Sequence, residues 1–136
     1  MRYLSIDYGS KRTGLAICDP SETIVSPLAV IQSQKDLLKK ILSLVNGENV
    51  EAIVLGLPLN MDGSTGPQAK LVFQFADQLN DILDVPVHFQ DERLTSFSAE
   101  QKLAPAGLKR KDKRKRLDAV AAAEILQAFI ARKNEQ

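Results

Sequence analysis

The sequence contains few of the residues that mark several large classes of protein. Its only cysteine is Cys18, so a disulfide within the chain is impossible, which fits a reducing compartment. Its only histidine, His88, has no cysteine or second histidine near it, so we interpret it as a sheet residue and not as a zinc ligand. No apolar run is long enough to span a bilayer, and the first residues reach an acid too soon for a secretory signal. We therefore expect a cytoplasmic protein with no membrane partner.

What the sequence does contain is an ordinary globular composition with an uneven distribution of charge. The 136 residues, 44% hydrophobic and 26% charged, suffice for a single domain over residues 1–136. Residues 109–116 carry seven basic side chains and one acid, a net charge of +6, whereas the rest of the chain has a net charge of −5. Such a run suits a polyanion, or else it belongs to a solvated, flexible segment over about residues 104–116. The residues in it that we predict to bind nucleic acid are Lys109, Arg110, Lys111, Lys113 and Arg114.

Apolar periodicity predicts an alternation of strands and helices. Pro27 in the third strand favours a sheet edge or a bulge, and the continuous apolar run in the fourth favours a strand covered on both faces. The order predicts an α/β fold with a central five-stranded mixed sheet flanked by helices. The predicted strands are 2–7, 13–18, 23–30, 51–57 and 85–90, and the predicted helices are 34–45, 67–83, 95 or 96 to about 103, and about 116–132.

Three acids that are far apart in the sequence fall at the ends of predicted elements. Asp7 ends the first strand, Glu92 follows the fifth strand, and Asp118 lies in the first turn of the last helix. If the first, fourth and fifth strands are neighbours, their carboxyl ends meet at the edge where α/β sheets bind ligands. Clustered carboxylates repel each other unless cations hold them, and oxygen ligands suit Mg²⁺ or Mn²⁺. Two such ions activate a water and stabilise the leaving oxygen of a phosphodiester.

Each acid also has a purely structural interpretation. Asp118 would cap the helix or complement its dipole, Glu92 would pair with Arg93 or a distant lysine, and Asp7 would form an Asx-type turn. Spacing alone favours these roles for any single acid. The decision therefore depends on the residues that surround the three acids.

Four stretches around these acids resemble one protein family. They are SIDYGSKRTGLA at 5–16, GLPLNMDG at 56–63, DERLTS at 91–96 and DAVAA at 118–122. In this order they are similar to the YqgF family, whose members are described as Holliday-junction resolvases and as nucleases of the 16S ribosomal RNA precursor. The resemblance implies an RNase H-like fold related to the junction resolvase RuvC. It also implies that Asp7, Glu92 and Asp118 bind two metal ions, either Mg²⁺ or Mn²⁺. RuvC-like enzymes commonly have a fourth acid near the last helix, and Glu124 is the only candidate for it in this sequence.

Further residues in these motifs have either a nucleic-acid-binding or a structural interpretation. Gly9 would let backbone approach a phosphate, or only form a tight turn. Lys11 and Arg12, at a hairpin tip, would hold the phosphate backbone or remain solvated. Asn60 would bond nucleic acid or its own loop. Arg93 would bind the scissile phosphate or pair with a neighbouring acid.

The resemblance implies a metal-dependent nuclease that hydrolyses phosphodiester bonds in structured RNA, in 5′-end processing of the 16S precursor. An alternative substrate is branched DNA, in the form of a four-way junction. Symmetric cleavage of a junction needs a stable homodimer, whereas a monomer favours RNA as the substrate. We expect a monomer or a weak homodimer. A nucleotide-binding phosphotransferase is a third hypothesis, because residues 7–16 resemble one hairpin of the actin and sugar-kinase clamp. A non-catalytic nucleic-acid-binding regulator is the fourth, and it predicts no metal dependence.

Overall fold

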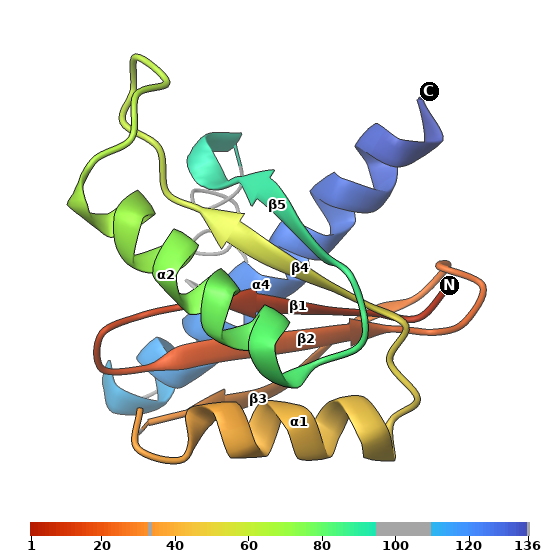
Figure 1. The fold of residues 1–136 in the computed structure, drawn as a ribbon. Helices are drawn as coiled ribbons and strands as arrows, with labels where there is room; N and C mark the ends of the chain where they lie inside the picture. Colours follow the sequence, from red (N-terminus) through yellow and green to blue (C-terminus); the bar gives the residue numbers. More distant parts are fainter. Residues whose placement is uncertain (33, 95–109, 136) are drawn as a thin grey trace.

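Five strands form one mixed sheet in the order β3-β2-β1-β4-β5 (Figure 1). In this computed structural model, residues 1–32, 34–94 and 110–135 are described. β1 is antiparallel to β2 and parallel to β4, and β4 is parallel to β5. This is the mixed five-stranded sheet predicted from the sequence. The strands are β1 (Tyr3–Asp7), β2 (Thr13–Cys18), β3 (Val25–Ile31), β4 (Ala52–Leu57) and β5 (Val87–Asp91), and the helices are α1 (Leu37–Gly47), α2 (Pro67–Ile82), the 3₁₀ turn η1 (Glu92–Leu94) and α4 (Arg110–Asn134).

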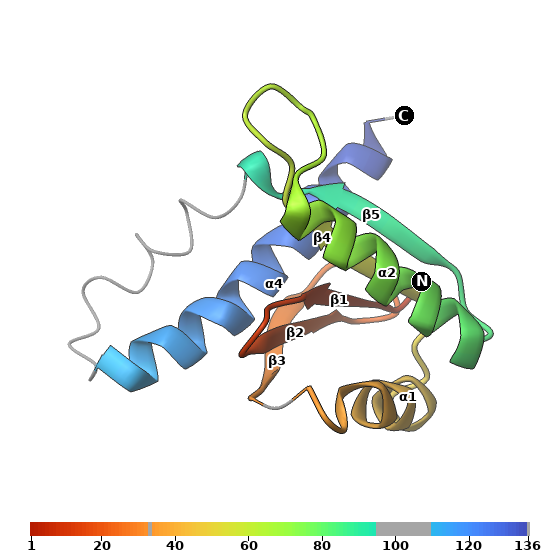
Figure 2. The same cartoon turned by 60° about the vertical axis from the view of Figure 1, so that its left-hand side comes forward.

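The helices cover both faces of the sheet, with α4 on one side and α1 and α2 on the other (Figure 2). Successive side chains of a strand point to opposite faces. Leu4 and Ile6 of β1 therefore join the core under α1 and α2, whereas Tyr3 packs with Phe129 of α4. Both faces of β1 and β4 are covered, which explains why residues 52–55 are continuously apolar and fully buried.

Small side chains let α4 lie close to the centre of the sheet. The hydroxyl of Ser5 in β1 donates a hydrogen bond of 2.6 Å to the backbone oxygen of Ala122, and both groups are buried. Ala16 of β2 packs against Ala122 and Ala123. A Cβ on Gly14 would collide with the backbone oxygen of Asp118. Residues 118–123 of α4 are thus held against β1 and β2.

The structure differs from the sequence prediction chiefly at the start of the last helix. We predicted a helix from about residue 116 after a flexible basic segment, but α4 already begins at Arg110. Lysine and arginine are good helix formers, and Asp112 stands four residues before Arg116, a spacing that supports a helix. The predicted helix at 95–103 and the residues 104–109 lie outside the described part of the chain.

Two smaller predictions concern the edge of the sheet and the membrane. β3 is an edge strand, and its pairing with β2 shifts register between Leu15 and Ala16, opposite Pro27. The prediction of an edge or a bulge is therefore confirmed, and both features are present. Within the described residues, every helix is too short or too polar to cross a bilayer.

Candidate active site at the carboxyl edge of the sheet

The parallel strands β1, β4 and β5 bring two of the three acids to one edge of the sheet. Asp7 is the last residue of β1, and Glu92 immediately follows β5, on the far side of β4. The alternation of side chains places Asp7 on the same face as Ser5, which is the face covered by α4. This arrangement confirms that the first, fourth and fifth strands are neighbours.

The carboxyl groups of Asp7 and Glu92 contact each other and share a hydrogen bond. Burial raises the pKa of Glu92 to about 9, and the hydrogen bond to Asp7 and the negative charge of Asp7 add to this rise. The pKa of Asp7 is also raised, because burial and the charge of Asp118 outweigh the hydrogen bond that Glu92 donates. At neutral pH Glu92 is therefore protonated and donates the hydrogen bond to Asp7.

Gly56 of β4 provides the space for the Glu92 carboxylate. Gly56 lies between β1 and β5 at the same edge, and a Cβ built on it would collide with Oε1 of Glu92 and lie 2.6 Å from Cδ1 of Ile125 in α4. Any side chain at this position would push Glu92 or α4 away. The glycine thus allows Glu92 to reach across the end of β4 toward Asp7.

Asp118 reaches the same edge from α4, but its carboxylate is bound to arginine. The helix backbone at Asp118 touches Gly14, which is the register partner of Asp7 across β1 and β2. Nε of Arg12, in the β1–β2 hairpin, lies 2.6 Å from Oδ2 of Asp118. The side chains of Arg12 and Asp118 are 34% and 26% exposed, so this ion pair is half-buried.

The three acids therefore lie together without forming a finished metal cage. Among the described residues, no three carboxylate, imidazole or thiolate groups are arranged as a bound metal ion requires. Two ligands nevertheless fit a divalent cation: Asp7 and Glu92 share a proton that a cation would replace, and both offer hard oxygen atoms.

The fourth acid considered from the sequence does not share the face of Asp118. Glu124 follows Asp118 by six residues in α4, whereas residues three, four or seven positions apart share one face of a helix. The positions that share a face with Asp118 are filled by Ala121, Ala122 and Ile125. The described part of α4 after residue 117 therefore offers one acid to the site.

The hairpin between β1 and β2 holds the other candidate residues near Asp7. A Cβ on Gly9 would collide with the backbone oxygen of Arg12, so this glycine is required for the close approach of the two sides of the hairpin. Lys11 is exposed at the tip. The ring of Tyr8 stacks on Phe75 of α2, with the centroids 4.2 Å apart, which ties the start of the hairpin to that helix.

The loop between β4 and α2 stands beyond the same edge of the sheet (Figure 1). Asn60 bonds within this loop: its Nδ2 donates to Oγ of Ser64 at 3.0 Å. Arg93 donates to Asp91 from Nε at 2.8 Å and to the backbone oxygen of Met61 at 3.2 Å. These contacts are the structural roles considered for Asn60 and Arg93, and their binding of nucleic acid stays a prediction.

Most of the basic run at residues 109–116 forms the first turns of α4. Arg110, Lys111, Lys113 and Arg114 belong to the first turns of this helix, whereas Lys109 lies outside the described residues. The helix continues directly into Asp118, so the run is joined to the acidic edge by a regular helix. Its predicted role in binding a polyanion stays open.

Sequence reasoning missed the two glycines that shape the site. Gly14 and Gly56 both lie inside strands, where glycine weakens pairing and often marks a close approach of other groups. That signal was present in the sequence. What it did not contain is the identity of the approaching groups, which are the backbone of Asp118 and the side chain of Glu92.

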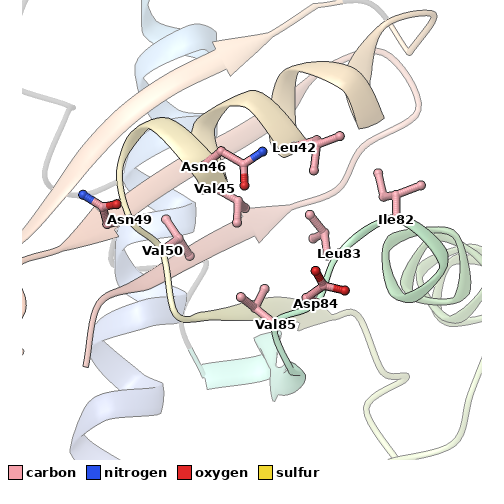
Figure 3. Close-up of a pocket in the computed structure, with 9 residues that line it drawn as sticks. All are labelled: Leu42, Val45, Asn46, Asn49, Val50, Ile82, Leu83, Asp84 and Val85. Atoms are coloured by element: carbon pink, nitrogen blue, oxygen red, sulfur yellow. The ribbon is translucent and has the colours of Figure 1, made fainter.

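A cavity of about 460 Å³ lies at the opposite end of the sheet, where β4 and β5 begin (Figure 3). Apolar side chains of α1 and α2, including Leu42, Val45 and Ile82, form much of its wall. Asp84 is the only acid among the residues that line it, and none of them is lysine or arginine. A phosphodiester would meet no positive charge there, so this cavity is not the candidate site.

Comparison with known proteins agrees with this fold. The structure is similar to Thermus thermophilus RuvC solved in complex with a Holliday junction substrate, with a TM-score of 0.59 and 19% identity, over 98% of this chain and 96% of that one. It is also similar to the Fowlpox virus resolvase solved with Holliday junction DNA, with a TM-score of 0.55 and 13% identity, over 95% and 99% of the two chains. The chain therefore has the RNase H-like fold of these resolvases.

Sequence comparison narrows this class to one family. The family model described as "RuvX: Holliday junction resolvase" matches residues 1–132. A protein of Roseiflexus sp. (strain RS-1) named "Putative pre-16S rRNA nuclease" is 44% identical, over 95% of this chain and 93% of the relative. A protein of the same name from Maridesulfovibrio salexigens is 40% identical, over 97% and 99% of the two chains. The chain belongs to the RuvX family, which is the family that its motifs indicated under the name YqgF.

Proposed function

We propose that this RuvX family member is a divalent-metal-dependent nuclease that processes the 5′ end of the 16S ribosomal RNA precursor. The observation that carries this proposal is the hydrogen-bonded pair of carboxyl groups, Asp7 and Glu92, at the carboxyl edge of the sheet, with Asp118 beside them. The relatives that are 40% and 44% identical are named for this RNA, and they support RNA as the substrate.

The residues of the site divide into those that would hold metal and those that would hold the substrate. Asp7 and Glu92 would bind Mg²⁺ or Mn²⁺, and Asp118 would complete the ligand set from α4. When bound, such ions supply an activated water and stabilise the charge of the leaving oxygen. The chain itself contributes a fixed pair of carboxylates and a glycine, Gly56, that leaves room for one of them.

Basic residues on three segments would orient the substrate around the acids. Lys11 lies exposed on the β1–β2 hairpin, Arg93 lies beside Glu92, and the basic residues from 110 onward lead into Asp118 along α4. Contacts of this kind position the phosphate backbone without reading its sequence. We propose that they align one strand so that a phosphate lies over Asp7.

Cleavage of a four-way DNA junction is the second candidate function. It is favoured by the description of the matching family and by resolvases that share the fold. These structural relatives are less than 20% identical, so the likeness concerns the fold. The closer similarity to proteins named for precursor RNA makes RNA the first choice.

One assay separates these possibilities. Purified protein is incubated with precursor 16S RNA or a synthetic four-way junction, in Mg²⁺, Mn²⁺ or EDTA. We expect metal-dependent cleavage of the RNA, and we expect Asp7→Asn to lower it by at least about 100-fold, as losing a group that acts in the transition state does. Asp84→Asn is the matched control, because this exposed acid lies at the opposite end of the sheet. Full activity of Asp7→Asn would refute the assignment, and preferential cleavage of the junction would favour the second candidate.

A further inference from the structure

The ion pair between Arg12 and Asp118 lies inside the candidate metal site. Arg12 belongs to the β1–β2 hairpin and Asp118 to α4, 106 residues later in the chain. Their atoms Nε and Oδ2 are 2.6 Å apart, which is short for a charge-assisted hydrogen bond. The negative charge of Asp118 is close enough to Asp7 to raise the pKa of Asp7. A positive side chain thus already neutralises one of the three acids.

The position of this pair explains why the three acids do not form a finished cage. A carboxylate oxygen that accepts a 2.6 Å bond from a guanidinium has its negative charge directed to that group. A metal ion that used the same oxygen would be repelled by the guanidinium at short range. Arg12 and a divalent ion therefore compete for Oδ2 of Asp118.

We propose that Arg12 acts as an internal cation that competes with the divalent ion for Asp118, and that it leaves Asp118 when the ion binds. This inference rests on the proposed function, since it assigns Asp118 to the metal site. Arg12 is here a positioning residue. It holds the carboxylate of Asp118 in place and compensates its negative charge until the metal ion binds.

The side chain released in this exchange has a second use at the same edge. A guanidinium binds carboxylate and phosphate with the same planar set of donors. Arg12 sits on a hairpin held close by Gly9, next to the exposed Lys11. The bound ion would thus take over Asp118 and free Arg12 for a phosphate of the substrate, which couples metal loading to substrate binding.

The test is the affinity of the metal-free protein for Mn²⁺, measured by titration calorimetry without nucleic acid. Arg12→Ala should bind Mn²⁺ about two- to tenfold more tightly than the wild type, because a half-buried ion pair no longer has to break. Arg12→Gln, which keeps most of the stem, should do the same, so the result does not depend on one variant folding. Lys11→Ala removes the same charge from the neighbouring position and should leave the Mn²⁺ affinity close to that of the wild type.

A double-mutant cycle makes the test specific to the pair. In an Asp118→Asn background, Arg12→Ala should not change the affinity for Mn²⁺, because the competition has no target left. Three results would each overturn the proposal. The first is that both Arg12 variants bind Mn²⁺ no more tightly than the wild type, and the second is that Lys11→Ala tightens Mn²⁺ binding as much as they do. The third is that Arg12→Ala still tightens Mn²⁺ binding in the Asp118→Asn background.

The outcomes also separate this inference from the proposed function. If the wild type binds Mn²⁺ and Asp7→Asn does not, the metal site stands and the Arg12 variants alone decide the inference. If the wild type binds no Mn²⁺, or Asp7→Asn binds it equally well, the metal site is wrong and the inference falls with it.

Discussion

The shared proton of Asp7 and Glu92 makes a testable prediction about stability and pH. The pKa of Glu92 is raised from 4.5 to about 9 in the folded, metal-free protein, whereas in the unfolded chain it returns to its ordinary value. Between these two values the folded state holds a proton that the unfolded state has released. A rise in pH therefore favours the unfolded state, and the free energy of unfolding falls as pH increases from about 4.5 to about 9.

The size of the effect follows from one proton. Each pH unit lowers the free energy of unfolding by up to about 1.4 kcal/mol for a single retained proton. From pH 6 to pH 8 the loss reaches about 3 kcal/mol, and at about 4 °C per kcal/mol for a chain of this size Tm falls by about 10 °C. Saturating Mg²⁺ should abolish this slope, because the ion replaces the proton in the folded state.

Urea denaturation at a series of pH values in EDTA measures this slope. Glu92→Gln is the matched control, since glutamine keeps a donor for Asp7 but does not titrate. The wild type should lose stability with rising pH while the Glu92→Gln variant changes much less. Equal slopes for the two proteins, or a wild type that becomes more stable toward pH 8, would refute the shared proton.

Three further predictions concern the packing and the charge around the site. Gly56→Ala should move Glu92 and lower cleavage by about 100-fold in a steady-state assay. It should also lower the free energy of unfolding by about 1–3 kcal/mol. Unchanged activity would contradict the close contact between Gly56 and Glu92. Gly14→Ala should destabilise the protein by a similar or larger amount in denaturation, because the colliding group is the backbone at Asp118 and not a flexible side chain. Replacing the lysines and arginines of residues 110–116 with glutamine should weaken RNA binding and reduce the slope of log Kd against log salt by about 0.7 for each lost phosphate contact. An unaltered slope would show that these basic residues do not contact phosphate.

The topology of the sheet was predictable because each strand carries a local signal. The continuous apolar residues 52–55 indicate a strand covered on both faces, and β4 indeed lies between β1 and β5. Pro27 indicates an edge or a bulge, and β3 has both features. Once β1, β4 and β5 are neighbours, the meeting of Asp7 and Glu92 at one edge follows from strand direction alone.

The start of α4 and the ionic state of the acids were not predictable in this way. The first turns of α4 form from a run of charge that also suits a flexible segment, so the sequence pattern was ambiguous. The sharing of a proton by Asp7 and Glu92 depends on burial and on the space left by Gly56. The pairing of Arg12 with Asp118 depends on how closely α4 approaches the hairpin, which is a property of packing across 106 residues.

The metal site is tested most directly by locating Mn²⁺ in crystals of the protein by its anomalous scattering. We expect a peak bound by the carboxylates of Asp7 and Glu92 at the carboxyl edge of the sheet, with Asp118 turned toward it and away from Arg12. A peak at another group of side chains, with Asp7 and Glu92 still hydrogen-bonded to each other at saturating Mn²⁺, would contradict it.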